Sequence, residues 1–298
     1  MIPSGSVRMR RRSAGLLIAV VAGLAVGCSE PAEDRVDLDE IIDSQVASLS
    51  PQGPYRDPKK AERETAREAV GLLLAANPDR DRAGQLLEEI GYRVTRGVDA
   101  VDGRQFVMFM AGDDTGWAGM IVDPSARIGS VVEVPHPSFD RNTDKLGMSL
   151  YRTLPGSMLL IAGAHRQAAG GAGDVAHNDR SMFQVISEQA AERQVPQLQL
   201  HGFAERSLPG ADAVVSTGSG PHNEYAVRVA RELKAEQLQV CRAWVSRCVG
   251  LEGTTNVQSS AASEHDAEFV HLELSWSLRR DQAGRDQVRD AVATAWKG

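Results

Sequence analysis

Residues 130–162 read SVVEVPHPSFDRNTDKLGMSLYRTLPGSMLLIA, and their pattern indicates the fold class. It begins with an apolar, β-branched run at 130–134, passes through a polar loop into a helical pattern at 143–154, and ends in a second apolar run at 157–162. Two buried strands joined by a helix form the unit of a parallel sheet, because parallel neighbours need a long crossover connection. The stretch therefore predicts an α/β fold.

The same alternation continues to residue 274. Further helices are predicted at 181–193 and 223–236, and further strands at 197–200, 213–216, 238–240 and 268–274. Upstream, the apolar spacing predicts helices at 60–77 and 83–90 and antiparallel strands at 92–97, 105–110 and 117–122. We expect a mixed, mostly parallel sheet flanked by helices, preceded by a small helical and antiparallel hairpin segment.

The first 27 residues have the pattern of an export signal. A basic head at 8–12 precedes an uninterrupted apolar run at 16–27, which is shorter than the about 20 residues that a membrane-spanning helix needs. The small residues before Cys28 resemble the lipobox of bacterial lipoproteins. The sequence predicts a lipid anchor on Cys28 and a lipoprotein of the bacterial cell envelope that faces the periplasm. An uncleaved anchor, or cleavage without lipid, is the alternative.

Residues 28–58 are expected to form an acidic tether. The stretch after Cys28 is rich in Asp and Glu and offers little apolar surface to bury. Order is expected from about Lys59, which leaves residues 59–298 as the α/β domain.

Composition excludes one class of partner. The formal net charge of the 298 residues is −7, and it becomes −11 when the four arginines of the basic head are left out. No other basic cluster exists in the sequence, and a nucleic-acid surface needs one to neutralise phosphates. We expect no nucleic-acid partner.

Two cysteines remain once Cys28 is assigned to lipid. Cys241 and Cys248 are close in sequence, and an exported chain enters an oxidising compartment. We predict a disulfide between them. Two separately buried thiols are the alternative.

Histidines follow the predicted strands. His136 and His201 each come at a strand end, and Asp140 stands four residues after His136. Ligands of α/β sheets bind outside the carboxyl ends of strands, and two imidazoles with one carboxylate form the ligand set of a catalytic zinc site that keeps one position open. The pattern predicts a zinc ion held by these three residues. Histidines that only hydrogen-bond neighbouring loops are the alternative.

The last predicted strand places His271 and Glu273 on one face. A carboxylate inside an apolar strand is costly unless it is paired or functional. Beside a bound metal, Glu273 is the candidate that activates the attacking water; a structural salt bridge is the alternative. Arg166 is a candidate clamp for a substrate carboxylate, unless it is an ordinary surface arginine.

Five short motifs carry a family resemblance. In chain order they are Pro135-His136, the DVAHNDR segment at 174–180, Leu200-His201-Gly202, GTTN at 253–256 and HLEL at 271–274. Over about residues 130–280 this order resembles the N-formylglutamate amidohydrolases and their relatives, the zinc carboxypeptidase-like hydrolases. The resemblance implies one zinc, His136 and His201 as ligands and Glu273 as the base. Asp140 stands one residue later than the carboxypeptidase spacing and is shorter than the usual glutamate.

The same resemblance implies the substrate-binding residues. Asn178 and Arg180 match the loop that holds the substrate's carboxylate, although Asp179 separates them, and Thr255 and Asn256 lie in the turn that closes over the substrate.

Two functions compete at this point. The first is an exported, membrane-tethered, zinc-dependent hydrolase of an amide or peptide bond in a small anionic substrate. The second is a non-catalytic envelope lipoprotein that keeps the hydrolase fold as a binding or assembly module, which the departure at Asp140 favours. The two differ in one expectation: ligand atoms of His136, Asp140 and His201 converge in the enzyme and are scattered in the binding module.

Overall fold

The computed structural model describes residues 1–3, 5 and 35–297. Cys28, and the predicted export signal apart from residues 1–3 and 5, lie outside the described residues. No helix among the described residues is both long and apolar enough to span a bilayer.

Within residues 35–297, ten strands form one sheet in the order β1-β2-β3-β4-β6-β5-β7-β10-β8-β9. They are β1 (Arg35–Val36), β2 (Tyr92–Asp99), β3 (Gln105–Ala111), β4 (Gly119–Val122), β5 (Ser130–Val134), β6 (Ser157–Ile161), β7 (Gln197–Phe203), β8 (Ala213–Ser216), β9 (Val240–Arg242) and β10 (Phe269–Ser275). The central strands β6, β5, β7 and β10 run parallel. This confirms the mixed, mostly parallel sheet.

The hairpin segment that precedes the parallel strands in sequence continues the same sheet. Strands β2, β3 and β4 pair antiparallel with one another. Strand β4 then pairs antiparallel with β6, with Met120 opposite Leu160. The antiparallel strands therefore extend the parallel sheet on one side.

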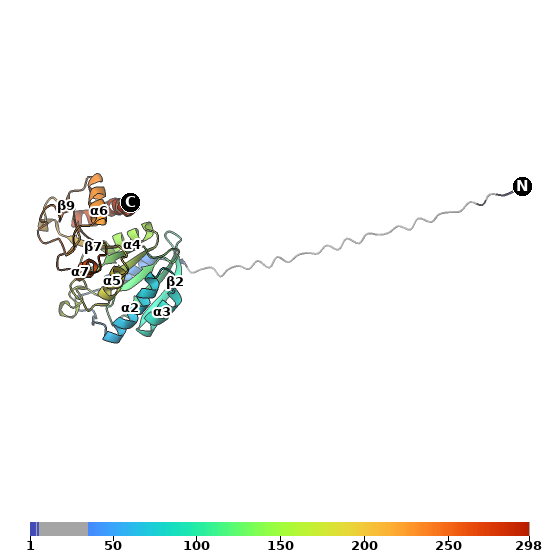
Figure 1. The fold of residues 1–298 in the computed structure, drawn as a ribbon, viewed down its shortest axis with the longest axis horizontal. Helices are drawn as coiled ribbons and strands as arrows, with labels where there is room; N and C mark the ends of the chain where they lie inside the picture. Colours follow the sequence, from blue (N-terminus) through green and yellow to red (C-terminus); the bar gives the residue numbers. More distant parts are fainter. Residues whose placement is uncertain (4, 6–34, 298) are drawn as a thin grey trace. The chain divides into compact units, whose positions relative to one another are not determined.

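Helices cover both faces of the sheet (Figure 1). The main helices are α1 (Leu38–Ser48), α2 (Lys60–Leu74), α3 (Arg80–Glu89), α4 (Thr143–Thr153), α5 (Met182–Glu192), α6 (Glu224–Ala235), α7 (Val257–Glu264), α8 (Trp276–Arg279) and α9 (Gln282–Lys297). Helices α1, α4, α6 and α9 share one apolar core with the sheet. Helices α2, α3 and α5 share a second core on the other face.

The tether predicted at 28–58 is wrong from residue 35 onward, because these residues belong to the folded unit. Strand β1 pairs in parallel with β2. Leu38 and Ile42 of α1 are buried in the core that includes α4. The acidic residues are used as partners: Asp39 pairs with Arg152 at 2.9 Å and Asp43 with Lys145 at 2.7 Å. Acidic composition concealed an amphipathic helix that begins at the cap residue Asp37, whose side chain accepts from the Glu40 amide.

Candidate metal centre and active site

The parallel strands deliver the candidate residues to one edge of the sheet. His136 follows the end of β5, while His201 lies near the end of β7 and Glu273 near the end of β10. His201 and Glu273 stand opposite each other in the β7–β10 ladder. Since these strands are parallel neighbours, their carboxyl ends meet, as expected for a ligand site in an α/β sheet.

Three potential ligand atoms converge there. The Oδ2 atom of Asp140 lies 3.3 Å from Nδ1 of His136 and 3.3 Å from Nδ1 of His201. These distances are long for charge-assisted hydrogen bonds. They match the about 3.3–3.4 Å edge of a tetrahedron whose metal–ligand bonds are about 2.0–2.1 Å. The three residues are a group that could hold a metal ion.

A turn compensates for the unusual spacing of Asp140. The Asp140 amide donates to the carbonyl oxygen of His136 at 2.8 Å, so the loop coils back after the histidine. This coil returns the short carboxylate to the imidazole four residues earlier. The departure from the carboxypeptidase spacing therefore does not prevent the two residues from meeting.

Hydrogen bonds behind the histidines set their tautomers. Nε2 of His136 lies 2.8 Å from Asp174 Oδ1, and Nε2 of His201 lies 2.7 Å from Gln199 Oε1. The Gln199 oxygen is identified by its amide nitrogen, which donates to Glu133 at 2.8 Å. Both histidines therefore carry hydrogen on Nε2, which leaves the Nδ1 lone pairs facing Asp140. This arrangement fits a metal ion, because outer partners of this kind orient ligating histidines.

The electrostatics of the site follow from burial and charge. Burial opposes the ionised form of Asp140, but His136 and His201, whose Nδ1 atoms donate to it when the rings carry a second proton, hold the pKa of its carboxyl well below the usual range. Burial lowers the pKa of His271 well below its ordinary value, so this ring is neutral. Burial, and then the charge of Asp140, raise the pKa of Glu273 to about 8. A bound cation favours the ionised form of Glu273.

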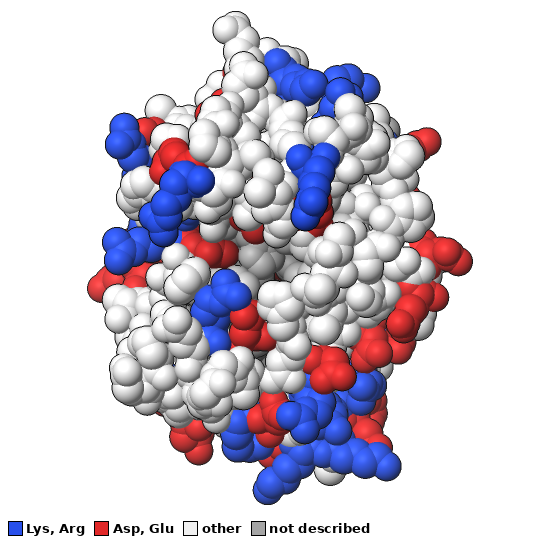
Figure 2. All heavy atoms as spheres, turned by 90° about the vertical axis from the view of Figure 1, so that its left-hand side faces the viewer, with Lys and Arg blue, Asp and Glu red and all other residues white. Residues whose placement is uncertain are grey.

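A cavity of about 210 Å³ lies beside the three ligand atoms. His136, His201, His271 and Glu273 line it, together with Arg166. Among the described residues, His271 Nδ1 and Glu273 Oε2 are buried atoms without a hydrogen-bond partner. Buried polar atoms of this kind need an explanation, and a water or ligand in the cavity supplies one. The face shown in Figure 2 is hollowed near its centre, with basic and acidic side chains on the rim.

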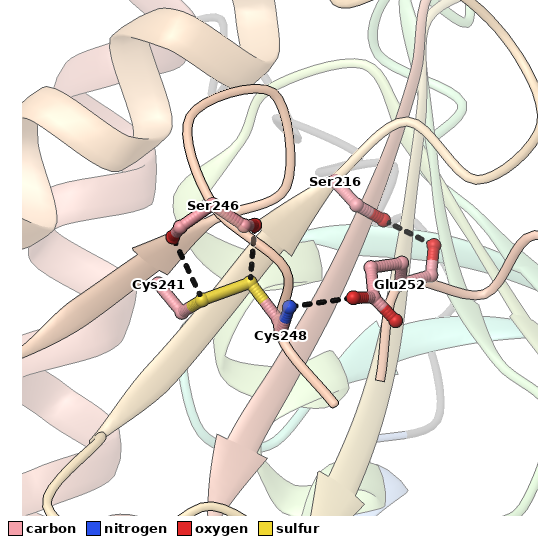
Figure 3. The surroundings of a disulfide bond; sticks show 5 residues. All are labelled: Ser216, Cys241, Ser246, Cys248 and Glu252. Atoms are coloured by element: carbon pink, nitrogen blue, oxygen red, sulfur yellow. Dashed lines mark hydrogen bonds between the residues drawn. A yellow bond between two sulfur atoms is a disulfide. The ribbon is translucent and has the colours of Figure 1, made fainter. Parts of the chain in front are cut away.

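The loop after the disulfide forms one wall of this cavity. The Cys241–Cys248 disulfide is present, as predicted. Figure 3 shows two further ties: the Cys248 amide donates to the Glu252 carboxylate, and the Ser216 hydroxyl donates to the Glu252 carbonyl at 2.6 Å. Gly253 follows with φ +64°, and a β-carbon there would collide with the His271 ring. The loop therefore approaches the site closely at a glycine.

The structure brings several predicted residues to the cavity. Arg166 lines it, and its Nη2 atom pairs with Asp174 Oδ2 at 2.5 Å. Thr255 also lines it. Asn256 reaches it, but its side chain already donates to Gln199 at 2.5 Å and caps α7 by accepting from the Ser259 amide at 2.9 Å. Asn256 thus supports the site instead of presenting free groups to a substrate.

Asn178 and Arg180 are not brought to the cavity. The Asn178 amide donates to Tyr55, at 3.0 Å, to Asp57, at 2.8 Å, and to a backbone carbonyl. Arg180 pairs with Asp57 at 2.9 Å and is largely exposed. The two residues therefore hold the segment around Asp57 against the loop before α5, and the substrate-binding role implied for them is not supported by their position.

Three supporting residues were missed in the sequence. Asp174 was seen only as part of a motif, and Glu133 and Gln199 only as parts of strands. A signal was present for Gln199, because it stands two residues before His201 and side chains at this spacing share one face of a strand. Polar residues inside otherwise apolar strands, as at Glu133, are a further signal.

Comparisons with known proteins find similarity in structure only. No protein-family model matches the chain, and no curated protein shows significant sequence similarity to it. A bacteriophage poly-gamma-glutamate hydrolase superimposes with a TM-score of 0.44 and 14% identity, covering 61% of this chain and 88% of its own. An aspartoacylase family protein from Mesorhizobium loti gives a TM-score of 0.37 and 14% identity, covering 69% and 68%.

A tripeptide-bound cell shape determinant protein from Helicobacter pylori gives a TM-score of 0.39 and 12% identity, covering 59% of this chain and 55% of its own. At such identities and TM-scores the similarity carries no argument about activity, which has to come from the site itself.

Proposed function

We propose that this protein is a zinc-dependent hydrolase of amide or peptide bonds in small substrates that carry a free carboxylate. The observation that carries the proposal is the convergence of Nδ1 of His136, Nδ1 of His201 and Oδ2 of Asp140 beside a cavity that Glu273 lines. Two nitrogens and one oxygen in this arrangement leave a coordination position open, as catalytic zinc sites do.

The residues divide the chemistry among them. His136, Asp140 and His201 would hold the zinc, which would supply a Lewis acid for a carbonyl group and for water. Glu273 takes a proton from the water that attacks the carbonyl carbon, and passes it to the leaving nitrogen as the C–N bond breaks. Arg166 binds the substrate's carboxylate, and Asp174 orients its guanidinium group.

The convergence supports the enzyme over the non-catalytic binding module. The binding module is expected to have these side chains scattered. His136, Asp140 and His201 are instead buried together, with 2%, 4% and 6% of their surface exposed. Buried ligand atoms that converge in this way are the arrangement expected of the enzyme.

The test is metal analysis combined with turnover on defined compounds. Purified mature protein is expected to contain about one zinc, and His201→Ala is expected to lose it. Glu273→Gln is expected to keep zinc and to lose turnover at least a thousand-fold on acylated amino acids and short peptides. Glu264→Gln, an exposed glutamate of α7, is the matched control and should change neither. Metal-free wild-type protein, or full activity in Glu273→Gln, would contradict the proposal.

We also propose export to the bacterial envelope and attachment through a lipid on Cys28. The signal pattern supports this, and so does the Cys241–Cys248 bridge, because disulfides persist in oxidising compartments. Labelling cells with a radioactive fatty acid should mark the wild-type protein and leave Cys28→Ser unmarked. Equal labelling of both proteins, or of neither, contradicts the lipid anchor.

A further inference from the structure

A second cavity, of about 300 Å³, lies next to the metal centre. The ligand residue Asp140 lies on its wall, and so does Gly202, the neighbour of His201. Three arginines also line it: Arg141, Arg206 and Arg279. Nothing in the reaction proposed above uses these arginines.

Arg279 is a buried cation without a carboxylate partner among the described residues. Only 5% of its surface is exposed. Its hydrogen bonds go to the backbone carbonyls of Leu274, at 3.0 Å, Arg141, at 2.5 Å, and Phe203, at 3.4 Å. A guanidinium group has five N–H donors, so these contacts leave two. The charges of Asp140, Glu273 and Glu205 act on it from nearby without forming an ion pair, and an anion in the cavity would compensate the buried charge directly.

The chain leaves room for this guanidinium group. A β-carbon at Gly202 would collide with the guanidinium group of Arg279. The glycine therefore allows the charge to lie against β7, one residue from the ligand His201. This close approach places Arg279 at the edge of the metal centre and not on the general surface.

The other two arginines are exposed and unpaired. Within residues 35–297, the side chains of Arg141 and Arg206 make no hydrogen bond or ion pair. The nearby acids form no ion pair with these two arginines. Asp140 faces the two histidines, and Glu205 accepts from the Ser277 amide at 2.5 Å. The lining of the cavity is therefore positive, which favours an anionic ligand.

The remaining lining is aromatic. Phe139, with 50% of its surface exposed, and Trp276 both face the cavity. The guanidinium of Arg166 lies 5.0 Å from the Phe139 ring centre. Since Arg166 lines the first cavity and Phe139 the second, a substrate that passes over Phe139 reaches both.

We infer that the second cavity is a subsite for a second carboxylate of the substrate, carried on an apolar or peptide stem and bound by Arg141, Arg206 and Arg279. The inference rests on the proposed function for the position of the scissile bond. It names a substrate class: compounds with acidic groups on both sides of the bond that is cleaved.

The experiment measures binding of a small dicarboxylate, glutarate, to the zinc-loaded protein by ligand-observed NMR. The double variant Arg141→Gln/Arg206→Gln is expected to weaken glutarate binding at least tenfold. The matched control is Arg280→Gln, which removes the same charge at an exposed arginine outside the cavity and should stay within twofold of wild type. An Arg166→Gln background removes the clamp of the first cavity, and the effect of the double variant should persist there.

Two comparison ligands identify the chemistry. Glutaramide, which has the same stem without charge, is expected to bind at least tenfold more weakly than glutarate. Inorganic phosphate is expected to bind more weakly than glutarate as well. Equal binding of glutarate by the double variant and wild type overturns the subsite, as does equal binding of glutaramide; tighter binding of phosphate that the double variant abolishes overturns the carboxylate assignment.

The outcome is separate from that of the proposed function. If the wild-type protein has neither zinc nor turnover, but the double variant still binds glutarate more weakly than wild type, the anion subsite is supported and the hydrolase is contradicted. If zinc and turnover are present, and the double variant binds glutarate as tightly as wild type, the hydrolase is supported and the subsite is contradicted.

Discussion

Nε2 of His201 lies 2.7 Å from Oε1 of Gln199, and this contact fixes which nitrogen of the histidine faces the metal centre. Gln199 is held in turn, because its amide nitrogen lies 2.8 Å from Glu133 and 3.1 Å from Gln258. All four side chains are buried. The orientation of one proposed zinc ligand is therefore set by a polar network that runs through the sheet.

We expect Gln199→Leu to weaken zinc binding by about 10–100-fold, the usual effect of losing an outer partner of a ligating histidine. Competition with a chelator measures the dissociation constant directly. Gln189→Leu removes a buried glutamine amide whose partners are Glu192 and Arg193, and should leave zinc affinity unchanged. An unchanged dissociation constant in Gln199→Leu would show that the contact does not orient His201.

Asp174 has the same role for His136, so we expect Asp174→Asn to lower zinc affinity by about 10–100-fold. The substitution also releases Arg166, so KM for a carboxylate substrate should rise in zinc-saturated protein. His177→Gln is the control, because this half-exposed histidine contacts the same carboxylate, at 3.2 Å, without touching the metal ligands. If His177→Gln and Asp174→Asn have equal effects, the role assigned to Asp174 is wrong.

The buried carboxyl group of Glu133 makes the free energy of unfolding depend on pH. Burial raises its pKa from 4.5 to about 7, although hydrogen bonds from Gln199 and Ser187 act in the opposite direction. The folded state then binds more protons than the unfolded state between pH 4.5 and 7, so the contribution of Glu133 is complete below pH 4.5 and is lost as pH rises through 7. The loss amounts to about 3 kcal/mol.

The measurement compares wild type with Glu133→Gln by urea unfolding in metal-free protein. The variant should gain stability relative to wild type as pH rises from 5 to 8, because the neutral amide has no charge to bury. Parallel pH curves for the two proteins would contradict this.

The double variant Cys241→Ser/Cys248→Ser tests the loop that the disulfide anchors. A loop this short predicts a loss of about 2–3 kcal/mol in the free energy of unfolding. The wall residues Gly253 and Thr255 follow the bridge, whereas the metal ligands do not, so KM should rise while zinc affinity stays within twofold. A change in zinc affinity with unchanged KM would contradict this division.

Most elements could be predicted because their periodicity is local. The strands at 130–134 and 157–161 and the helix at 143–153 lie where the apolar spacing placed them. Composition does not reveal helix α1, because a segment rich in Asp and Glu resembles a disordered tether. Its apolar residues Leu38 and Ile42 are buried, and its acids are stabilised by Lys145 and Arg152, more than a hundred residues away.

The candidate site, too, could be predicted only in part. His136, His201 and Glu273 could be placed together, because parallel strands share a carboxyl edge. The position of Asn178 could not be predicted, since its partners Tyr55 and Asp57 lie over a hundred residues earlier. Gln199 shares a strand face with His201, but its role depends on the tautomer of that histidine, which the sequence does not show.

Oε1 of Gln199 accepts hydrogen bonds from both His201 and Asn256. Asn256 lies at the end of the cavity wall and caps α7. A displacement of this wall would therefore remove one partner from the oxygen that orients the proposed zinc ligand. Occupancy of the cavity and metal binding would then be coupled, each changing the other by the same factor. The apparent affinity of this protein for its metal should therefore depend on whether a substrate occupies the cavity.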